Sequence, residues 1–298
     1  MNNNPESKQF WRLAGPILLY WVIRGVAEGL IALIFVIPHF GEIINYQALS
    51  GSMDQQQFVD FYIQITEKIM KIVEQYQVEI LGIVALLTLF LTVPLFFMDR
   101  KREAALQLPQ NKKAEAWKYS AILVFGAAAC IGMSCLVIMT NLAFMSDKYQ
   151  LVSNAFYSAS FPAQIIVIGI IIPITEELMF RGVLFKRYRE QGSFFRAALY
   201  SSLLFSFLHN NVVQFLYTFF LGVFLAYVYE KYGSFKAPVL LHITANLVSL
   251  ILTNAGGIAW LAGKPIRMGV ASIVSAFIGS AIFVFMQRIN QKSTEQSS

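Results

Sequence analysis

Long apolar runs separated by short polar segments dominate the pattern of this chain. A helix crosses the hydrocarbon core of a bilayer with roughly 20 consecutive apolar residues, and about eight runs reach or approach that length. The run 197–210 is too short to cross alone, so we expect a broken or re-entrant segment buried among other helices there. The pattern therefore predicts an all-α bundle of transmembrane helices, with spans at residues 12–37, 79–98, 119–145, 162–183, 197–210, 212–229, 238–254 and 268–287.

Composition and charge agree with this architecture. Hydrophobic residues make up 57% of the chain and charged residues only 13%, against about 25% charged in soluble domains. Lys and Arg concentrate in alternate connections, which predicts a cell-membrane protein with both chain ends on the cytoplasmic side. The net charge of +6 is then explained by topology, and no polar segment is long enough to form a nucleic-acid-binding domain.

The spans fall into two groups along the chain. Residues 1–117 form a two-span unit whose external segment, at about 54–77, has the three- and four-residue spacing of an amphipathic helix. The basic stretch 99–118 resembles a linker to a core at residues 118–287. The polar tail 288–298 is expected to be disordered.

One run carries charges that a bilayer disfavours, in TEELMFRG at 175–182. Each ionised side chain inside hydrocarbon costs about 2.5–3.5 kcal/mol, so the charges need a compensating reason. Glu177 and Arg181 are four residues apart, share a helix face and can form an ion pair. Glu176 lies about 100° further round the helix, away from that partner, and is the candidate general base.

Further polar residues reach a similar depth on neighbouring runs. His209 ends FSFLH, and His242 and Asn246 in HITAN are four residues apart, which presents an imidazole and an amide on one face. Any one such residue could simply hydrogen-bond helices together. Two histidines, two glutamates and an amide at one depth favour a functional site.

These motifs resemble a known family. EELMFR at 176–181 is similar to the EExxxR motif of the CPBP family, the CAAX proteases and bacteriocin-processing enzymes, also called Abi, which includes type II CAAX prenyl endopeptidases. FSFLH, which begins at Phe205, is similar to the FxxxH motif of that family, and HITAN to its HxxxN motif. The resemblance covers roughly residues 118–285 and leaves residues 1–117 without an assignment beyond membrane anchoring.

The resemblance implies an intramembrane endopeptidase whose cleft opens to the cytoplasm. Glu176 would activate water with help from His209, and His242 and Asn246 would donate hydrogen bonds to the oxyanion. The substrate would be a peptide or a membrane protein, and the sequence does not show whether it is prenylated.

The resemblance also implies supporting roles for Glu177, Arg181 and Phe205. An alternative uses the same catalytic atoms to bind metal, since Glu176, His209 and His242 could supply three ligands to one zinc ion. The chain has no HExxH pair. Two oxyanion donors would give both His242 and Asn246 a role, whereas a metal site would use only the histidine, and this favours the metal-free base.

Two other functions compete with the protease. A non-catalytic bacteriocin-immunity or scaffold protein could keep the same side-chain arrangement. A transporter would place buried charges on an ion path, but it predicts paired repeats that the sequence does not show.

Overall fold

The computed structural model describes residues 5–43, 54–109, 111–142, 144–209 and 211–289. These residues form helices and connections, with no strand among them. The tail beyond residue 289, expected to be disordered, lies outside the described residues.

Seven helices in this part of the chain are long and apolar enough to cross a membrane. The predicted all-α, multi-pass bundle is therefore confirmed. The remaining expected span is α11 (Phe194–Ser206), a helix of 13 residues that packs against α12. The seven are α1 (Pro5–Val36), α5 (Gln77–Ala105), α6 (Ser120–Met139), the composite span Phe161–Gln191, α12 (Val212–Tyr232), α13 (Lys236–Asn254) and α15 (Pro265–Gln287).

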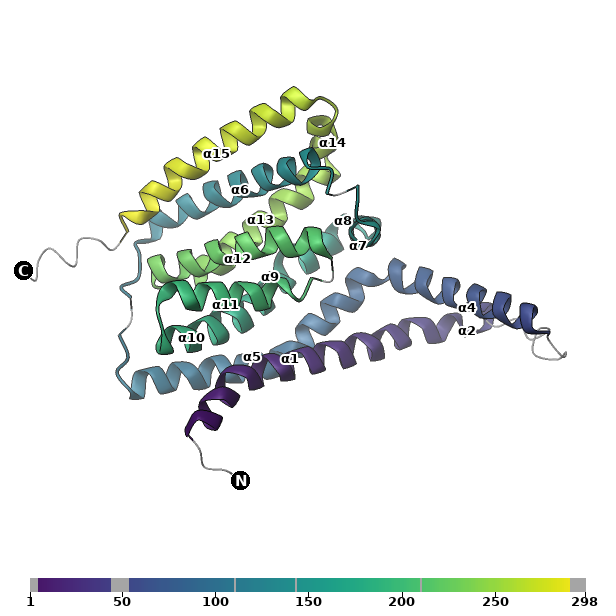
Figure 1. Cartoon of the computed structure of the whole chain (residues 1–298), viewed down its shortest axis with the longest axis horizontal. Coiled ribbons are helices and arrows are strands. Elements are labelled where there is room, and N and C mark those ends of the chain that lie inside the picture. The colour runs from purple at the N-terminus through teal and green to yellow at the C-terminus, as the bar shows by residue number, and fades with distance from the viewer. Residues whose placement is uncertain (1–4, 44–53, 110, 143, 210, 290–298) are drawn as a thin grey trace, which may run out of the picture.

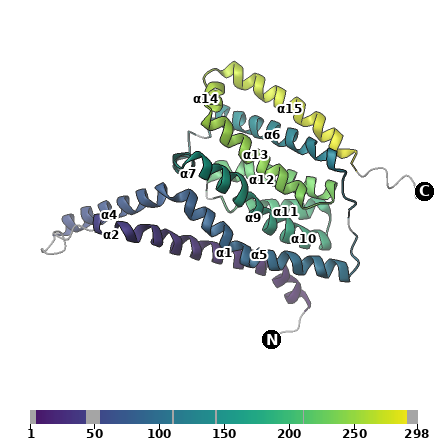
Figure 2. The same cartoon turned by 180° about the vertical axis from the view of Figure 1, so that it is seen from behind.

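The long helices form layers, with α15 beside α6, α6 beside α13, and α12 and α11 next to them (Figure 1). At the other edge α1 pairs with α5, and the far end of α1 forms an arm with α4 (Gln55–Gln75), as Figure 2 shows from behind. Asp54 caps α4, because its side chain accepts a hydrogen bond from the Gln57 amide. The shorter helices are α2 (Phe40–Ile43), α7 (Asp147–Ser158), α14 (Gly257–Ala262), and the 3₁₀ turns η1 (Ile37–His39) and η2 (Ala116–Tyr119).

The composite span changes its helical form along its length. Its central α9 carries the two adjacent glutamates and lies between two π-helical segments, whose turns are wider than those of an α-helix. Such turns occur often at functional sites because they shift side chains out of the regular register. In order, the segments are α8 (Phe161–Ala163), η3 (Gln164–Ile171), α9 (Ile172–Glu177), η4 (Leu178–Phe185) and α10 (Lys186–Gln191).

Close packing holds the helices together, since lipid tails are as apolar as the side chains that face them. Tyr20 of α1, Phe180 of η4 and Phe205 of α11 are buried in one core cluster, and the Phe180 ring contacts each of the other two rings. Gly222 allows a close approach, because a Cβ there would lie 2.9 Å from the Arg181 Nη2 atom. This hydrophobic cluster therefore occupies the interior of the bundle between the two glutamates of α9 and helix α10.

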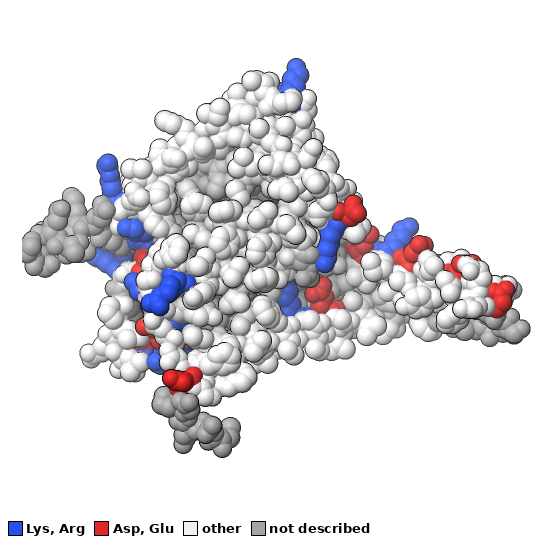
Figure 3. All heavy atoms as spheres, viewed as in Figure 1, with Lys and Arg blue, Asp and Glu red and all other residues white. Residues whose placement is uncertain are grey.

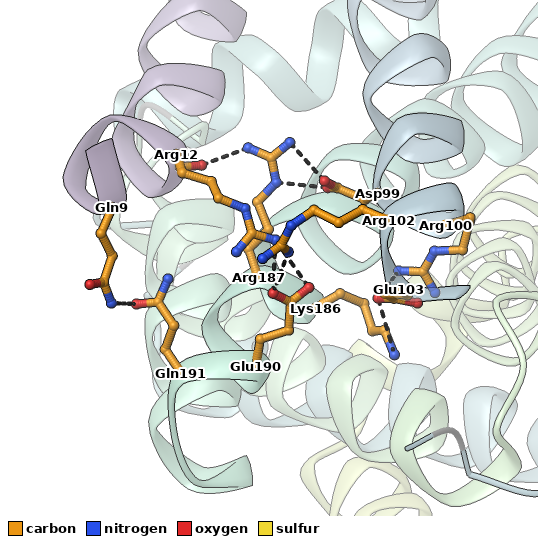
Figure 4. Close-up of polar contacts among 10 residues, drawn as sticks. All are labelled: Gln9, Arg12, Asp99, Arg100, Arg102, Glu103, Lys186, Arg187, Glu190 and Gln191. Atoms are coloured by element: carbon orange, nitrogen blue, oxygen red, sulfur yellow. Dashed lines mark hydrogen bonds and ion pairs between the residues drawn. The ribbon is translucent and has the colours of Figure 1, made fainter. Parts of the chain in front are cut away.

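At the α10 end of the bundle an ion-pair network joins α1, α5 and α10 (Figure 4). Arg187 donates to both carboxylate oxygens of Asp99, at 2.7 and 3.1 Å, and to the Arg12 carbonyl at 2.6 Å. Glu190 pairs with Arg12 at 2.8 Å and with Arg102 at 2.7 Å. We call these five residues the basic-end network. Here the expected linker 99–118 continues α5 as far as Ala105, so α1 and α5 are fastened directly to α10.

Candidate active site

The centre of the site is a buried ion pair on the composite span. Arg181 Nη1 donates to Glu177 Oε1 at 3.0 Å, and neither side chain is exposed. Arg181 also donates from Nη2 to the Gly222 carbonyl at 3.1 Å, and its guanidinium lies 4.6 Å from the centre of the Phe205 ring. The four-residue spacing predicts this pair, and the extra contacts offset much of the cost of burying it.

Glu177 has a second partner that the sequence did not predict. The Nδ1 atom of His242, on α13, lies 2.9 Å from the same Oε1 atom. An ionised carboxylate can only accept, so we assign the ring proton to Nδ1. This leaves Nε2 directed towards Glu176, at 3.9 Å from its Oε2 atom.

Glu176 also has a cationic neighbour. The Nη1 atom of Arg24, on α1, lies 3.6 Å from Glu176 Oε1. The expectation that Glu176 stands without such a partner is therefore wrong, because a helix distant in sequence supplies one. Arg24 belongs to the unit at residues 1–117, for which the sequence analysis assigned only anchoring.

Phe205 packs between the two histidines of the site. Its ring centre lies 5.3 Å from that of His209 and 5.7 Å from that of His242, edge to face in both cases. The Nδ1 atom of His209 is buried and has no hydrogen-bond partner in the described part of the chain. Phe205 thus fixes the positions of both rings, while His209 keeps unused hydrogen-bonding capacity.

Asn246 is partly committed to helix packing. Its Nδ2 atom donates at 2.8 Å to the carbonyl of Ile168 in the π-helical η3. An amide carries two N–H donors, so one remains for another acceptor. Asn246 therefore ties α13 to the composite span and can still present a donor at the site.

A cavity of about 430 Å³ brings these residues together. Arg24, Glu176, His209, His242 and Asn246 all line it. The four residues expected to be catalytic, from three separate motifs, thus share one cavity, which the expected supporting residues Glu177, Arg181 and Phe205 do not line. Helix α1 adds a residue that those motifs do not include.

The cavity extends away from the basic-end network. Its walls include Met70 and Glu74 of α4 and Leu151 of α7, and Figure 1 shows α7 at the end of the bundle remote from α10. Towards α10, Phe180 and Leu184 are fully buried and do not line it. The resemblance implies a cleft open to the cytoplasm, and that orientation stays a prediction.

The side chains do not fit the metal alternative. No three histidine, cysteine or acidic residues in the described ranges are grouped closely enough to hold one metal ion. Glu176 and His242 approach to 3.9 Å, but His209 does not complete a three-ligand set with them. We therefore derive no step through a metal.

Fold and site together define a multi-pass membrane protein with acid, base and amide groups around an intramembrane cavity. Residues 158–248 match the family described as Type II CAAX prenyl endopeptidase Rce1-like. The chain is also similar to the "Putative membrane peptidase YdiL" of Bacillus subtilis (strain 168), at 32% identity over 91 residues. That alignment covers 30% of this chain and 37% of the relative.

No solved structure matches the chain. The matched segment contains all three motifs but excludes α1, α4 and most of α7. The similarity therefore supports intramembrane protease activity at the level of the family, while Arg24 and the α4 wall of the cavity lie outside it.

Proposed function

We propose that this protein is an intramembrane endopeptidase that hydrolyses peptide bonds of a membrane-associated peptide or protein. The observation that carries the proposal is the approach of Glu176 and His242, from separate helices, to 3.9 Å beside the cavity. The two atoms are too far apart for a direct hydrogen bond, and a water in the adjoining cavity can contact both of them as the second reactant in hydrolysis.

Glu176 is the general base of the proposed reaction. Its carboxylate takes a proton from the water as the water oxygen attacks the scissile carbonyl carbon. The tetrahedral intermediate then collapses, the C–N bond breaks, and Glu176 returns the proton to the leaving amine. His209, whose Nδ1 atom has no partner among the described residues, helps to hold the water.

Stabilisation of the oxyanion falls to His242 and Asn246. The Glu177 carboxylate at Nδ1 orients the His242 ring, and Nε2 donates when both ring nitrogens carry a proton. The second N–H of Asn246 is the other donor. Loss of one oxyanion donor costs about 2.7–4 kcal/mol of transition-state stabilisation in well-studied hydrolases.

The proposed substrate reaches the site from the end of the bundle formed by α4 and α7. With the basic end on the cytoplasmic side of a cell membrane, this opening faces outward. Leu151 lies on the cavity wall and is 55% exposed. Leu151→Cys, with Cys130 and Cys135 replaced by serine, should react with a membrane-impermeant maleimide added to intact cells; labelling only after lysis would contradict the outward opening.

Substitution of the base tests the activity itself. In proteoliposomes, Glu176→Gln should lower cleavage of a membrane-peptide library by about 10²- to 10⁴-fold, as expected for loss of a general base. Glu28→Gln is the matched control, because Glu28 lines the same cavity and is given no catalytic role. Cleavage should persist in chelator. Folded Glu176→Gln protein that cleaves at the wild-type rate would exclude the proposal.

A further inference from the structure

A second cavity, of about 380 Å³, lies at the basic end of the bundle. It is bounded by α5, the start of α10, and the turn between α12 and α13, and it shares no lining residue with the cavity of the candidate active site. Its lining residues are Phe96, Arg100, Asn111, Lys113, Phe185, Lys186, Tyr229, Glu230, Gly233, Ser234, Phe235 and Lys236. Nothing in the proposed reaction uses this cavity.

Positive charge exceeds negative charge around it. Arg100 and Lys186 share a single carboxylate, that of Glu103, at 2.7 and 3.6 Å. Lys113 and Lys236 also line the cavity, and no acidic partner for either is found within the described residues. One anion bound here would lie close to cations that the protein itself leaves incompletely neutralised.

The one acidic residue in the lining already has a partner. Glu230 pairs with Arg189 of α10 at 3.0 Å, so it does not neutralise the lysines. The Nε atom of Arg100 is buried without a hydrogen-bond partner among the described residues. The excess positive charge and a hydrogen-bond donor without a partner thus lie at the same wall of this cavity.

An aromatic wall faces the cations. The rings of Phe96 and Phe235 lie 5.1 Å apart, and Arg100 lies 5.3 Å above the Phe96 ring. Lys186 lies 5.9 Å above the ring of Tyr229. Apolar rings beside cations suit a ligand with both an anionic group and an apolar part.

Three membrane spans end at this cavity, so it lies at the boundary between bilayer and water. Next to Phe96 on α5, Phe97 is 58% and Met98 is 63% exposed on the outside of the bundle. Figure 3 shows Lys and Arg gathered at this end, next to a broad surface without charge. Basic pockets between helices at the cytoplasmic interface are a common form of lipid headgroup site.

We propose that this cavity binds the phosphate-bearing headgroup of an anionic membrane lipid. The phosphate contacts Lys113, Lys236 and the Arg100 side of the cavity, and the apolar part of the lipid lies along the outside of α5. A free phosphate compound shares the same charge chemistry, so the experiment must separate the two sources.

The test compares the protein with charge-matched variants by native mass spectrometry from detergent. Phosphatidylglycerol should bind to wild type, and Lys113→Gln/Lys236→Gln should raise its Kd by about 10- to 30-fold, as expected for two lysines near the headgroup. Lys101→Gln/Lys148→Gln removes the same charge from exposed positions outside the cavity and should leave the Kd unchanged. Equal weakening in both variants would overturn the proposal in favour of unspecific surface charge.

Two further arms identify the source of the phosphate. Phosphatidylcholine should bind to wild type and to the cavity variant equally weakly. Inorganic phosphate should not displace phosphatidylglycerol at equimolar concentration. Full displacement by inorganic phosphate would overturn the lipid assignment, as would equal affinity for the two lipids.

Discussion

The protein buries charge in two places that differ in how their hydrogen-bonding groups are used. In the basic-end network, Arg187 engages both oxygens of Asp99, and every buried side-chain nitrogen and oxygen of its described members has a partner. In the candidate active site, one oxygen of Glu177, the Nε atom of Arg181 and the Nδ1 atom of His209 are buried without one.

This contrast separates structural charge from functional charge better than burial alone. Buried polar groups in proteins are nearly always satisfied, so those that are not need an explanation. His209 lines a cavity that a substrate can occupy. The basic-end network joins three helices, and none of its five residues lines either cavity. Buried polar atoms that lack a hydrogen-bond partner and lie beside a cavity therefore mark the candidate active site.

The largest effect is expected for Glu177→Gln. It leaves the fully buried Arg181 without its countercharge and alters the partner of His242 Nδ1. Breaking a buried pair from one side costs about 3–5 kcal/mol of folding free energy. Unfolding in mixed micelles measures it, with Glu28→Gln as the control. A midpoint equal to that of wild type would show that the pair is not structural.

Periodicity and helix geometry predict those contacts of the candidate active site that form within one helix. The apolar runs define the spans, and the four-residue spacing of Glu177 and Arg181 predicts their contact, because helical neighbours follow from sequence alone. The motif order also leads to Phe205, His209, His242 and Asn246, although their chemical roles stay predictions.

Contacts between distant helices are not predictable in the same way. The partnerships of Arg24 with Glu176 and of His242 with Glu177 depend on which helix faces pack together, which hydrophobicity does not specify. The signal in the sequence for Arg24 is its own cost as a charge within a span.

His209→Gln should separate function from stability. It removes the proposed water-holding group and should lower kcat by about 100-fold, equivalent to about 2.7 kcal/mol. The unfolding midpoint should stay close to that of wild type, because the Nδ1 atom has no described partner to lose. A large loss of stability with full activity per folded molecule would make His209 structural.

Asp99→Asn should show the opposite behaviour. The Asp99 and Arg187 side chains are 6% and 8% exposed, so we expect a loss of about 2 kcal/mol, below the value for a fully buried pair. Cleavage per folded molecule should not change. The double variant Asp99→Leu/Arg187→Met should recover part of the stability, since no charge is then left alone. A loss of activity in folded Asp99→Asn would end the distinction between the two charged regions.

The smallest effect is expected for Arg24, which connects the front helices to the site. At 3.6 Å from Glu176 and with a side chain 23% exposed, its charge positions the proposed base without bonding it tightly. Arg24→Gln should lower kcat by about tenfold, or about 1.4 kcal/mol, with KM nearly unchanged. Arg24→Lys should recover most of the loss, because the charge is restored on the same helix face.

Stability measurements distinguish positioning from packing at Arg24. The unfolding midpoint of Arg24→Gln should stay close to that of wild type, because the side chain is partly exposed and its charge acts on Glu176 from 3.6 Å. Glu28→Gln, one turn further along α1, should leave kcat unchanged. A loss of kcat together with a large loss of stability, and no recovery in the lysine variant, would assign Arg24 to the fastening of α1 rather than to the site.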